Sequence, residues 1–234
     1  MPTELHLTLR PGEVWDAAAV ADVHLSARRA AAMPPSVHPE GDVREWLDRR
    51  LRGTDTVWVA EVDGVVGGYA RFTESWLDDL YVAPGLAGRG IGAALLDLVK
   101  QQRPGGFCLW VFEMNTPARD FYARRGLVEL EHTDGSGNEE QAPDIKMAWP
   151  GTEPLTFYRR LIDDVDQQLG DLLARRVALT SAVQAHKPHA TRDSAREAQI
   201  AAAMALRVPA LGEDRLRRIM HAVITESLDA VRGD

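Results

Sequence analysis

Three glycines at alternate positions mark the first segment that could do chemistry. They lie in LDDLYVAPGLAGRGIGAALLDLV (77–99), between a strand-like and a helix-like stretch. Gly88, Gly90 and Gly92 let the backbone approach a ligand closely and turn its N–H groups toward it. A helix that begins near Ile91 adds the positive end of its dipole. The segment predicts an anion-binding loop that suits a pyrophosphate, although a strand-to-helix turn can also need glycine for steric reasons alone.

Four carboxylates near this loop are candidates for a base that takes a proton from an amine through water. They are Glu74, Asp78, Asp79 and Glu113. Because side chains alternate along a strand, we expect Asp78 and Asp79 on opposite faces, with at most one of them in the site. We carry Asp79 forward as the catalytic candidate and leave the others open. His24, His38 and His132 show no metal-ligand spacing and are expected to be surface or boundary residues.

A second set of candidate residues interrupts the apolar face of a long helical segment, from Phe157 to about Lys187. Cations on such a face need anionic partners. Those partners are either acidic side chains of the chain, Asp166 or Glu197, or an anionic ligand such as a dicarboxylate, which two arginines can bind bidentately. The cations and their heptad neighbours are Arg159, Asp166, Leu173, Arg176, Thr180, Lys187 and, at the start of the next helix, Arg196.

The glycine loop and the segment WVFEMNTPARDFYARRGL (110–127) together resemble the GNAT N-acetyltransferase superfamily, over about the first 150 residues. L-Y-V-x-P-x-x-x-G-x-G-x-G is similar to its acetyl-CoA signature. The resemblance implies acetyl-CoA as cosubstrate, with the CoA pyrophosphate on the loop amides and pantetheine beside the strand before them. The residues that it implies for cofactor binding are Leu80, Val82, Gly88, Arg89, Gly90, Ile91, Gly92 and Asn115.

The same resemblance implies that Tyr122 protonates the departing CoA thiolate. Structural interpretations stand beside these roles, since Tyr122 could be a boundary aromatic next to Phe121 and Asn115 could cap the following helix. The Gln or Arg that usually opens the loop is Ala87 here. We expect weakened cofactor affinity at most, because the contacts of the loop are mostly made by the backbone.

The pattern I-D-x-x-D, L-L-x-x-R, a lysine and D-x-x-R-E is similar to the all-α chorismate mutase family, over nearly all of 155–231. The resemblance implies binding of chorismate by fixed cations, which hold a compact conformer and stabilise negative charge on the ether oxygen without base or metal. It implies that Arg159 reaches the partner subunit's site, that Arg176 binds a carboxylate and that Lys187 contacts the ether oxygen. Further contacts are implied for Asp193, Arg196, Glu197 and Ser227.

Two departures from the mutase pattern bear on activity. The Gln or Glu that usually follows the serine by one turn is Val231, and Pro188 directly follows Lys187. Losing one hydrogen bond to a transition state can cost about a hundredfold in rate. Some family members are activated by the first enzyme of the shikimate pathway. By analogy alone, the same kind of activation is a candidate for this chain. Isochorismate pyruvate lyases and amino-deoxychorismate mutases share the fold and remain alternatives.

The elements expected around these residues divide the chain in two. Strands are predicted at 56–62, 65–72, 77–82 and 107–112, with a hairpin at Asp63-Gly64, and helices at 13–31, 42–52, 90–101 and 116–125. After the linker 150–154, only helices are predicted, at 157–187, 193–207 and 213–231. The expected fold is α+β: a GNAT-like mixed sheet with flanking helices (1–150), followed by a three-helix chorismate mutase-like domain (151–234).

The first of these C-terminal helices spans about 45 Å, longer than so small a domain covers by itself. We therefore expect an intertwined homodimer through the C-terminal helices. A formal net charge of -8 and a pI of about 5.4 argue against nucleic acid as a partner. Cys108 is the single cysteine, and the sequence shows neither a signal peptide nor a membrane span, so a cytoplasmic location is expected.

The two resemblances predict a bifunctional enzyme that acetylates a small amine and rearranges chorismate to prephenate. No metal is expected in either site. The alternative is an acetyltransferase fused to a non-catalytic helical module for dimerisation or ligand sensing, which Val231 favours. A third interpretation, a degenerate acetyltransferase half, has only Ala87 in its support.

Overall fold

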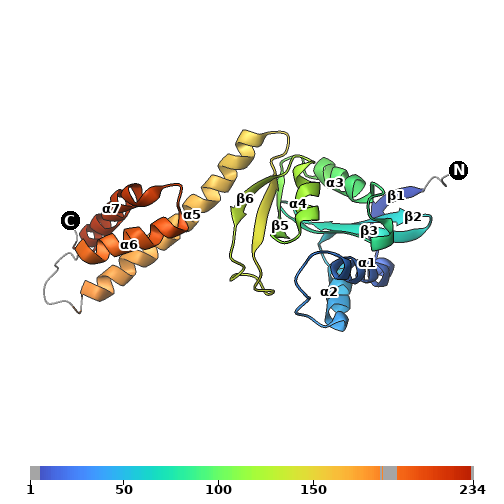
Figure 1. Cartoon of the computed structure of the whole chain (residues 1–234), viewed down its shortest axis with the longest axis horizontal. Helices are drawn as coiled ribbons and strands as arrows, with labels where there is room; N and C mark the ends of the chain where they lie inside the picture. The colour runs from blue at the N-terminus through green and yellow to red at the C-terminus, as the bar shows by residue number, and fades with distance from the viewer. Residues whose placement is uncertain (1–5, 185, 187–193, 233–234) are drawn as a thin grey trace. The chain divides into compact units, whose positions relative to one another are not determined.

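The computed structural model describes residues 6–184, 186 and 194–232, and the chain divides into two compact units between Tyr158 and Arg159 (Figure 1). The first unit contains two β-sheets with flanking helices, and the second is helical. Each unit is described by itself. Within the described ranges, no helix is both long and apolar enough to cross a bilayer.

The first sheet has four antiparallel strands in the order β1 (Leu7–Pro11), β2 (Thr56–Val62), β3 (Val65–Phe72) and β4 (Leu77–Val82). The β2–β3 turn has φ of 50° at Asp63 and 83° at Gly64. Two-residue hairpin turns of this kind need positive φ at both central positions, which Asp-Gly tolerates. The predicted hairpin is confirmed.

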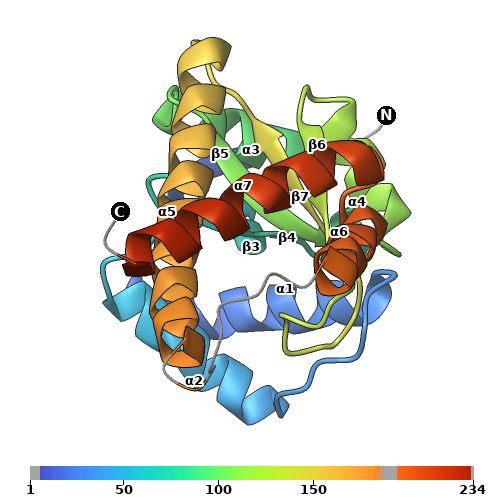
Figure 2. The same ribbon diagram turned by 90° about the vertical axis from the view of Figure 1, so that its left-hand side faces the viewer.

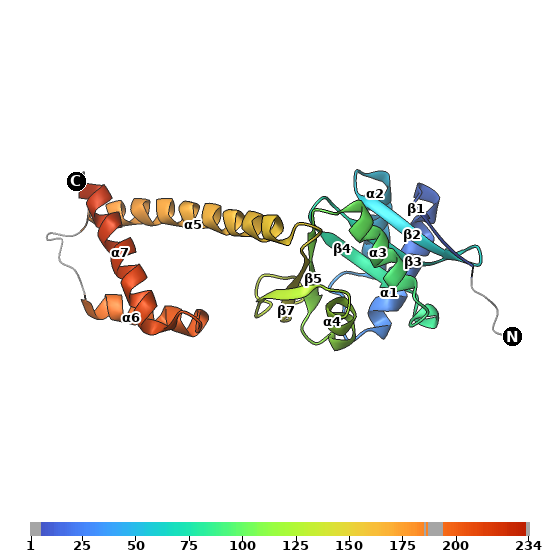
Figure 3. The ribbon, with the colours of Figure 1, turned by 90° about the horizontal axis from the view of Figure 1, so that it is seen from above.

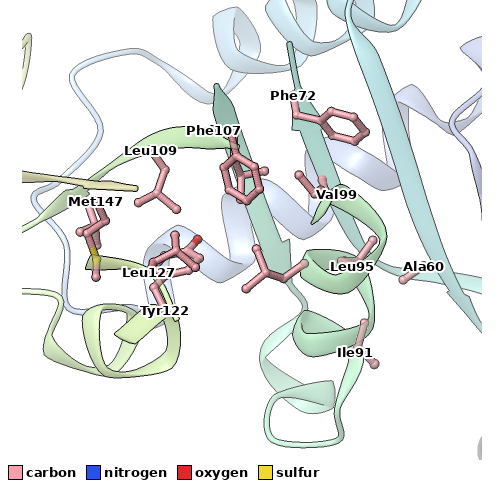
Figure 4. Packing of buried hydrophobic residues seen from close by; sticks show 14 of the residues in the cluster. Ala60, Phe72, Ile91, Leu95, Val99, Phe107, Leu109, Tyr122, Leu127 and Met147 are labelled. Atoms are coloured by element: carbon pink, nitrogen blue, oxygen red, sulfur yellow. The ribbon is translucent and has the colours of Figure 1, made fainter. Parts of the chain in front are cut away.

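Helices cover both faces of this sheet. After the short 3-10 helix η1 (Val14–Asp16), α1 (Ala17–Ala30) and α2 (Glu40–Arg52) pack on one face, and α3 (Ile91–Gln102) packs on the other (Figure 2). The α3 side is the larger core. Phe72, Leu95 and Phe107 are fully buried there, as Figure 4 shows. The 3-10 helix η2 (Pro84–Leu86) leads from β4 toward α3.

The second sheet is antiparallel in the order β5 (Phe107–Phe112), β7 (Asp144–Trp149) and β6 (Val128–His132), with α4 (Thr116–Ala123) between β5 and β6 in sequence. A single parallel bridge, Trp76 to Cys108, joins the two sheets, and the amide of Cys108 donates to the carbonyl of Ser75 at 2.9 Å. Beyond that bridge β4 and β5 do not pair. Between Leu80 and Val82, β4 therefore has one edge on β3 and one edge open.

The second unit is built from α5 (Pro154–Gln184), which begins in the first unit, α6 (Ser194–Arg207) and α7 (Gly212–Arg232). Helices α6 and α7 follow one another through a short turn and contact each other, at a marked angle (Figure 3). Their buried residues include Ala201, Leu216 and Ser227. Within the second unit, α5 has no fully buried side chain among its described residues, although apolar side chains follow its length. Exposed ones include Ile162, Val165, Leu169, Leu172 and Leu179, at 51–62% exposure.

Candidate functional site

The glycine loop has the geometry of an anion cradle. Gly88 and Gly90 adopt φ of 75° and 86°, the left-handed region that favours glycine. A Cβ built on either residue would meet no atom within 4 Å, so the space in front of the loop is open. Gly90 is the N-cap of α3 and supplies no side-chain cap, and the first N–H groups of a helix lack acceptors within the helix. The loop can therefore donate backbone hydrogen bonds to an anion.

The other residues of the loop differ in what they offer. The side chain of Ile91 is buried in the core at 2% exposure, so only its backbone N–H is available to a ligand. Arg89 is exposed. Gly92 lies in the first turn of α3, where a built Cβ would be 3.6 Å from the ring of Phe121 on α4. This close approach ties the loop to the helix that carries Tyr122.

A cleft of about 1450 Å³ lies beside the open edge of β4. Strands β4 and β5 contribute Leu77–Tyr81 and Leu109–Phe112, and α4 contributes Ala118 and Tyr122. Trp46 from α2 and Trp110 from β5 also line it. The divergence of the two strands thus produces the cleft.

Both aspartates of β4 line this cleft, which corrects the expectation that they lie on opposite faces. The pairing of β3 with β4 runs from Arg71 opposite Asp79 to Phe72 opposite Leu77, so Asp78 is an extra residue in a β-bulge. A bulge breaks the alternation of side chains along a strand. Both carboxylates consequently contact the same guanidinium group, that of Arg71.

Arg71 is the centre of a cluster of three carboxylates. Its Nε lies 2.6 Å from Oδ2 of Asp79, and its Nη1 lies 3.1 Å from Oδ2 of Asp55 and 3.6 Å from Oδ2 of Asp78. The side chains of Arg71 and Asp79 are 10% and 8% exposed, whereas that of Asp78 is 30% exposed. Burial raises the pKa of Asp78, partly offset by the lowering effect of Arg71. Asp79 is therefore held in a buried ion pair, and Asp78 is the more accessible carboxylate.

A buried aromatic group adjoins the cluster and was not anticipated from the sequence. Nδ1 of His24 lies 2.7 Å from the hydroxyl of Tyr69, and the His24 and Tyr81 rings are 4.6 Å apart. His24 is 6% exposed, so its expected place at the surface or boundary is wrong. Burial lowers the pKa of His24 and raises that of Tyr81 to about 12. The sequence held one signal for this region: Arg71 is a cation between the apolar Ala70 and Phe72 of a predicted strand, and a cation in that position needs buried anionic partners.

Tyr122 reaches the cleft from α4. The residue is 8% exposed, and its hydroxyl has no hydrogen-bond partner among the described residues. Burial raises its pKa, and the nearby Tyr81 and Asp79 add to this effect. The phenol is therefore protonated at neutral pH and can donate a hydrogen bond or a proton to a ligand.

Asn115 lines the same cleft and caps α4, because its Oδ1 accepts a hydrogen bond from the amide of Ala118 at 3.3 Å. Its amide nitrogen remains available as a donor. Glu113 and Glu74, the other candidate bases, do not line the cleft. In the described part of the chain, no group of three or more His, Cys, Asp or Glu residues is arranged to hold a metal.

In the second unit the structure brings Arg176 close to Ser227. Nη1 of Arg176 donates to the carbonyl of Val223 at 3.4 Å, and the Ser227 hydroxyl donates to the same carbonyl at 2.5 Å. Glu197 of α6 lies near His221 of α7, with 3.9 Å between Oε2 and Nδ1. No ion pair between described residues joins Arg159 or Arg176 to Asp166 or Glu197.

The remaining candidates of the second unit differ in exposure or lie outside the described residues. Arg159 and Arg196 are exposed, and Val231 is half-buried near the end of α7. Lys187 and Asp193 lie outside the described residues.

Known proteins match each unit separately. Residues 25–127 match the model of the acetyltransferase (GNAT) family. Over 101 residues the chain is 37% identical to the peptidyl-lysine N-acetyltransferase YiaC of Escherichia coli, covering 42% of this chain and 66% of that protein. Over 114 residues it is 34% identical to an uncharacterised N-acetyltransferase of Archaeoglobus fulgidus, covering 42% of this chain and 77% of that protein. The chain belongs to the GNAT acetyltransferase family.

Solved structures agree with this assignment at the level of the fold. YjaB of Escherichia coli matches with a TM-score of 0.52 at 17% identity, over 63% of this GNAT chain and 99% of that protein. A GCN5-related N-acetyltransferase of Rhodopseudomonas palustris matches with a TM-score of 0.53 at 24% identity, over 61% of this chain and 94% of that protein. YncA of Salmonella typhimurium, solved with its cofactor acetyl-CoA, matches with a TM-score of 0.50 at 19% identity, over 62% of this chain and 94% of that protein.

The helical unit of this GNAT protein matches a second family model. Residues 158–231 match the model of chorismate mutase type II. The chain thus carries a GNAT domain followed by a chorismate mutase domain, as the sequence motifs indicated.

Proposed function

We propose that the first domain transfers the acetyl group of acetyl-CoA to the nitrogen of a small amine. The observation that carries the proposal is the meeting of an open glycine cradle, a cleft beside an unpaired strand edge and a protonated, unpartnered Tyr122 hydroxyl. Acetyl-CoA is present in the solved structure of YncA, which shares the fold. The cofactor supplies the acetyl group as a thioester.

Each part of the site has a role in binding under this proposal. The amides of residues 88–92 hold the pyrophosphate at the helix N-terminus. The open edge of β4 at Leu80 and Val82 pairs with the amides of the pantetheine arm, and the amide nitrogen of Asn115 donates to the same arm. Arg89, exposed beside the cradle, adds positive charge.

Proton movement is assigned to Tyr122 and to one carboxylate of β4. A carboxylate of the Asp78–Asp79 pair receives the proton that the amine must lose, either directly or through water. Tyr122 donates a proton to the leaving sulfur, and is neutral for this task because burial raises its pKa. The protein gains one proton and loses one in each transfer. The site returns to its starting state when the carboxylate passes its proton, directly or through water, to the Tyr122 phenolate.

The binding part of the proposal is tested by Gly90→Asp. The substitution places a side chain on a left-handed backbone and a negative charge where the pyrophosphate should lie. Calorimetric binding of acetyl-CoA should be lost, whereas Gly64→Asp, a left-handed glycine in the β2–β3 hairpin, should bind as the wild type does. Unchanged affinity of Gly90→Asp would remove the case for this site.

We propose that the second domain binds chorismate and converts it to prephenate. Arg176 beside Ser227 supplies one carboxylate contact, and the sequence adds Lys187 for the ether oxygen. Asp193, Arg196 and Glu197 would complete the contacts. Isochorismate and amino-deoxychorismate carry the same carboxylates and remain candidate substrates. Activation by a shikimate-pathway enzyme is retained as an analogy.

Arg159 enters this site only in a homodimer. The residue is exposed in a single chain, as is the apolar face of α5 that accompanies it. A second copy that covers this face would bring its own Arg159 to the first copy's site. The domains are proposed to run over 1–150 and 151–234. With Cys108 as the single cysteine, a reducing, cytoplasmic location is proposed.

A non-catalytic helical module is the second candidate, because Val231 stands where the family places a second donor. Loss of chorismate absorbance should distinguish the two. Under the enzyme proposal, Lys187→Ala abolishes turnover and Val231→Gln raises it. No turnover in wild type or either variant, together with no calorimetric binding of a bicyclic transition-state analogue, would assign the domain to the module.

A further inference from the structure

The lining of the cleft is strongly acidic. It contains nine carboxylates and two arginines, with no lysine. Both arginines are already paired, since Nη2 of Arg28 lies 2.9 Å from Glu140 and Nη1 of Arg49 lies 3.1 Å from Glu45. His24 is buried with a lowered pKa and adds no positive charge at neutral pH. The space that receives the acceptor therefore has a large excess of negative charge.

Under the proposed acetyl transfer, the unpartnered Tyr122 hydroxyl marks the end of the cleft that reacts. Its buried position beside Tyr81 and Asp79 places the leaving group next to the β4 carboxylates. Asp78 and Asp79 are sufficient to attract the amine that reacts. The other carboxylates of the lining come from elements away from β4, and a single reacting nitrogen at β4 leaves Asp42 and Glu131 among them without an ion-pair partner in the part of the chain that the structure describes.

These remaining carboxylates form two walls. Helix α2 contributes Asp42 and Glu45, and strands β6 and β7 with their connecting loop contribute Glu131, Asp134, Glu139, Glu140 and Asp144. Asp42 and Glu131, one on each wall, are exposed. Neither forms an ion pair with any cation that the structure describes. A second positive charge on the acceptor would find partners there.

Two contacts join the β6–β7 wall to α1 and to the segment between α1 and α2. Arg28 of α1 meets Glu140, and Nε2 of His38, between α1 and α2, lies 2.6 Å from Oε2 of Glu139. All four side chains line the cleft. Because these two contacts bridge part of the opening, the cleft admits a thin, flexible chain more readily than the surface of a folded protein.

We infer that the acetyl acceptor is a small diamine or polyamine, whose distal ammonium group is held by the acidic walls at Asp42 and Glu131. The inference rests on the proposed acetyl transfer and specifies its substrate class. A cation a few ångströms from several carboxylates gains attraction that weakens as salt is added.

Three probes of equal chain length test the inference: 1,4-diaminobutane, 4-aminobutan-1-ol and 4-aminobutanoic acid. They share one reactive amine and differ at the far end by a positive, neutral or negative group. With the full chain and acetyl-CoA, release of CoA should give a kcat/KM about tenfold higher for the diamine than for the amino alcohol, and lowest for the amino acid. Added salt should reduce the difference between the diamine and the amino alcohol.

Charge-neutral variants locate the effect. Asp42→Asn combined with Glu131→Gln should lower the preference for the diamine by about threefold to tenfold while leaving turnover of the amino alcohol unchanged. The matched control is Asp48→Asn, on the same helix as Asp42 but outside the cleft lining, and it should change neither value.

Equal kcat/KM for the three probes, or a preference that salt and the double variant leave unchanged, would overturn the inference but not the acetyl transfer. Acetylation of a lysine-rich peptide without acetylation of any small amine would overturn it in favour of a protein acceptor. Absence of CoA release with every probe, together with absence of acetyl-CoA binding, would overturn the proposed function itself.

Discussion

Asp78 combines two properties that a general base needs. Its carboxyl faces the cleft, and burial raises its pKa. The groups that act on this carboxyl come from three elements and the turn before β2: Arg71 on β3, Asp79 on β4, Arg50 on α2 and Asp55. A higher pKa makes the ionised carboxylate a better proton acceptor.

Asp78→Asn should therefore lower kcat/KM by about a hundredfold or more and abolish the acid limb of the pH profile. In the wild type, activity should rise as pH increases through the raised pKa, above the ordinary value of about 3.9. The folded chain holds this proton more tightly than the unfolded chain, so the contribution of Asp78 to stability falls over the same pH rise. The variant should thus be no less stable than the wild type at neutral pH, as thermal unfolding can measure. An intact acid limb in Asp78→Asn would exclude it as the base.

Asp79→Asn should behave differently, because Asp79 is the buried partner of Arg71 at 2.6 Å. Breaking a buried ion pair from one side typically costs about 3–5 kcal/mol. We expect a marked loss of thermal stability, with any loss of activity following from it. If Asp79→Asn keeps its stability and loses the acid limb, the base is Asp79, as the sequence first suggested.

Tyr122→Phe removes only the unpartnered hydroxyl. We expect kcat to fall by about a hundredfold while calorimetric binding of acetyl-CoA stays unchanged, since the ring packing is retained. Tyr158→Phe, a half-buried tyrosine outside the cleft, is the control. Equal turnover in Tyr122→Phe and the wild type would leave Tyr122 with a packing role.

Among the elements, four strands and the seven α-helices of the described residues were predictable from the sequence because their hydrophobic periods were clear. Strands β1, β6 and β7 were missed. All five residues of β6 are exposed, so no inward-facing apolar set marks it. In β7, Ile145 and Met147 alternate with polar residues, and this signal was available. The bulge at Asp78 was not predictable, because register depends on the partner strand.

The same reasoning separates the candidate residues. The glycine loop, Asn115 and Tyr122 were predictable because a motif fixes their spacing. His24, Tyr69 and Arg71 come from α1 and β3, and only the folded chain brings them together beside β4. Charge on the cleft walls depends on elements far apart in sequence, α2 and the β6–β7 loop, and has no local pattern.

For the molecule as a whole, the exposed apolar face of α5 predicts association. The full chain should sediment as a dimer, and Leu169→Glu should shift it toward a monomer. Leu169 is 51% exposed in a single chain, so the substitution should cost little within the chain itself. Gln167→Glu, on the opposite side of α5, is the matched control. A monomeric wild type would contradict both the homodimer and the role of Arg159 across it.

The open edge of β4 has a further effect on how the chain behaves without its cofactor. An unpaired strand edge is a template for other strands, and many sheet proteins block theirs with charge, proline or a covering loop. Between Leu80 and Val82 this edge is left open by the divergence of β4 and β5. A pantetheine arm that pairs there would act as a temporary neighbouring strand. Protein freed of acetyl-CoA should therefore aggregate at a lower temperature on warming. Added acetyl-CoA should raise that temperature in a concentration-dependent way.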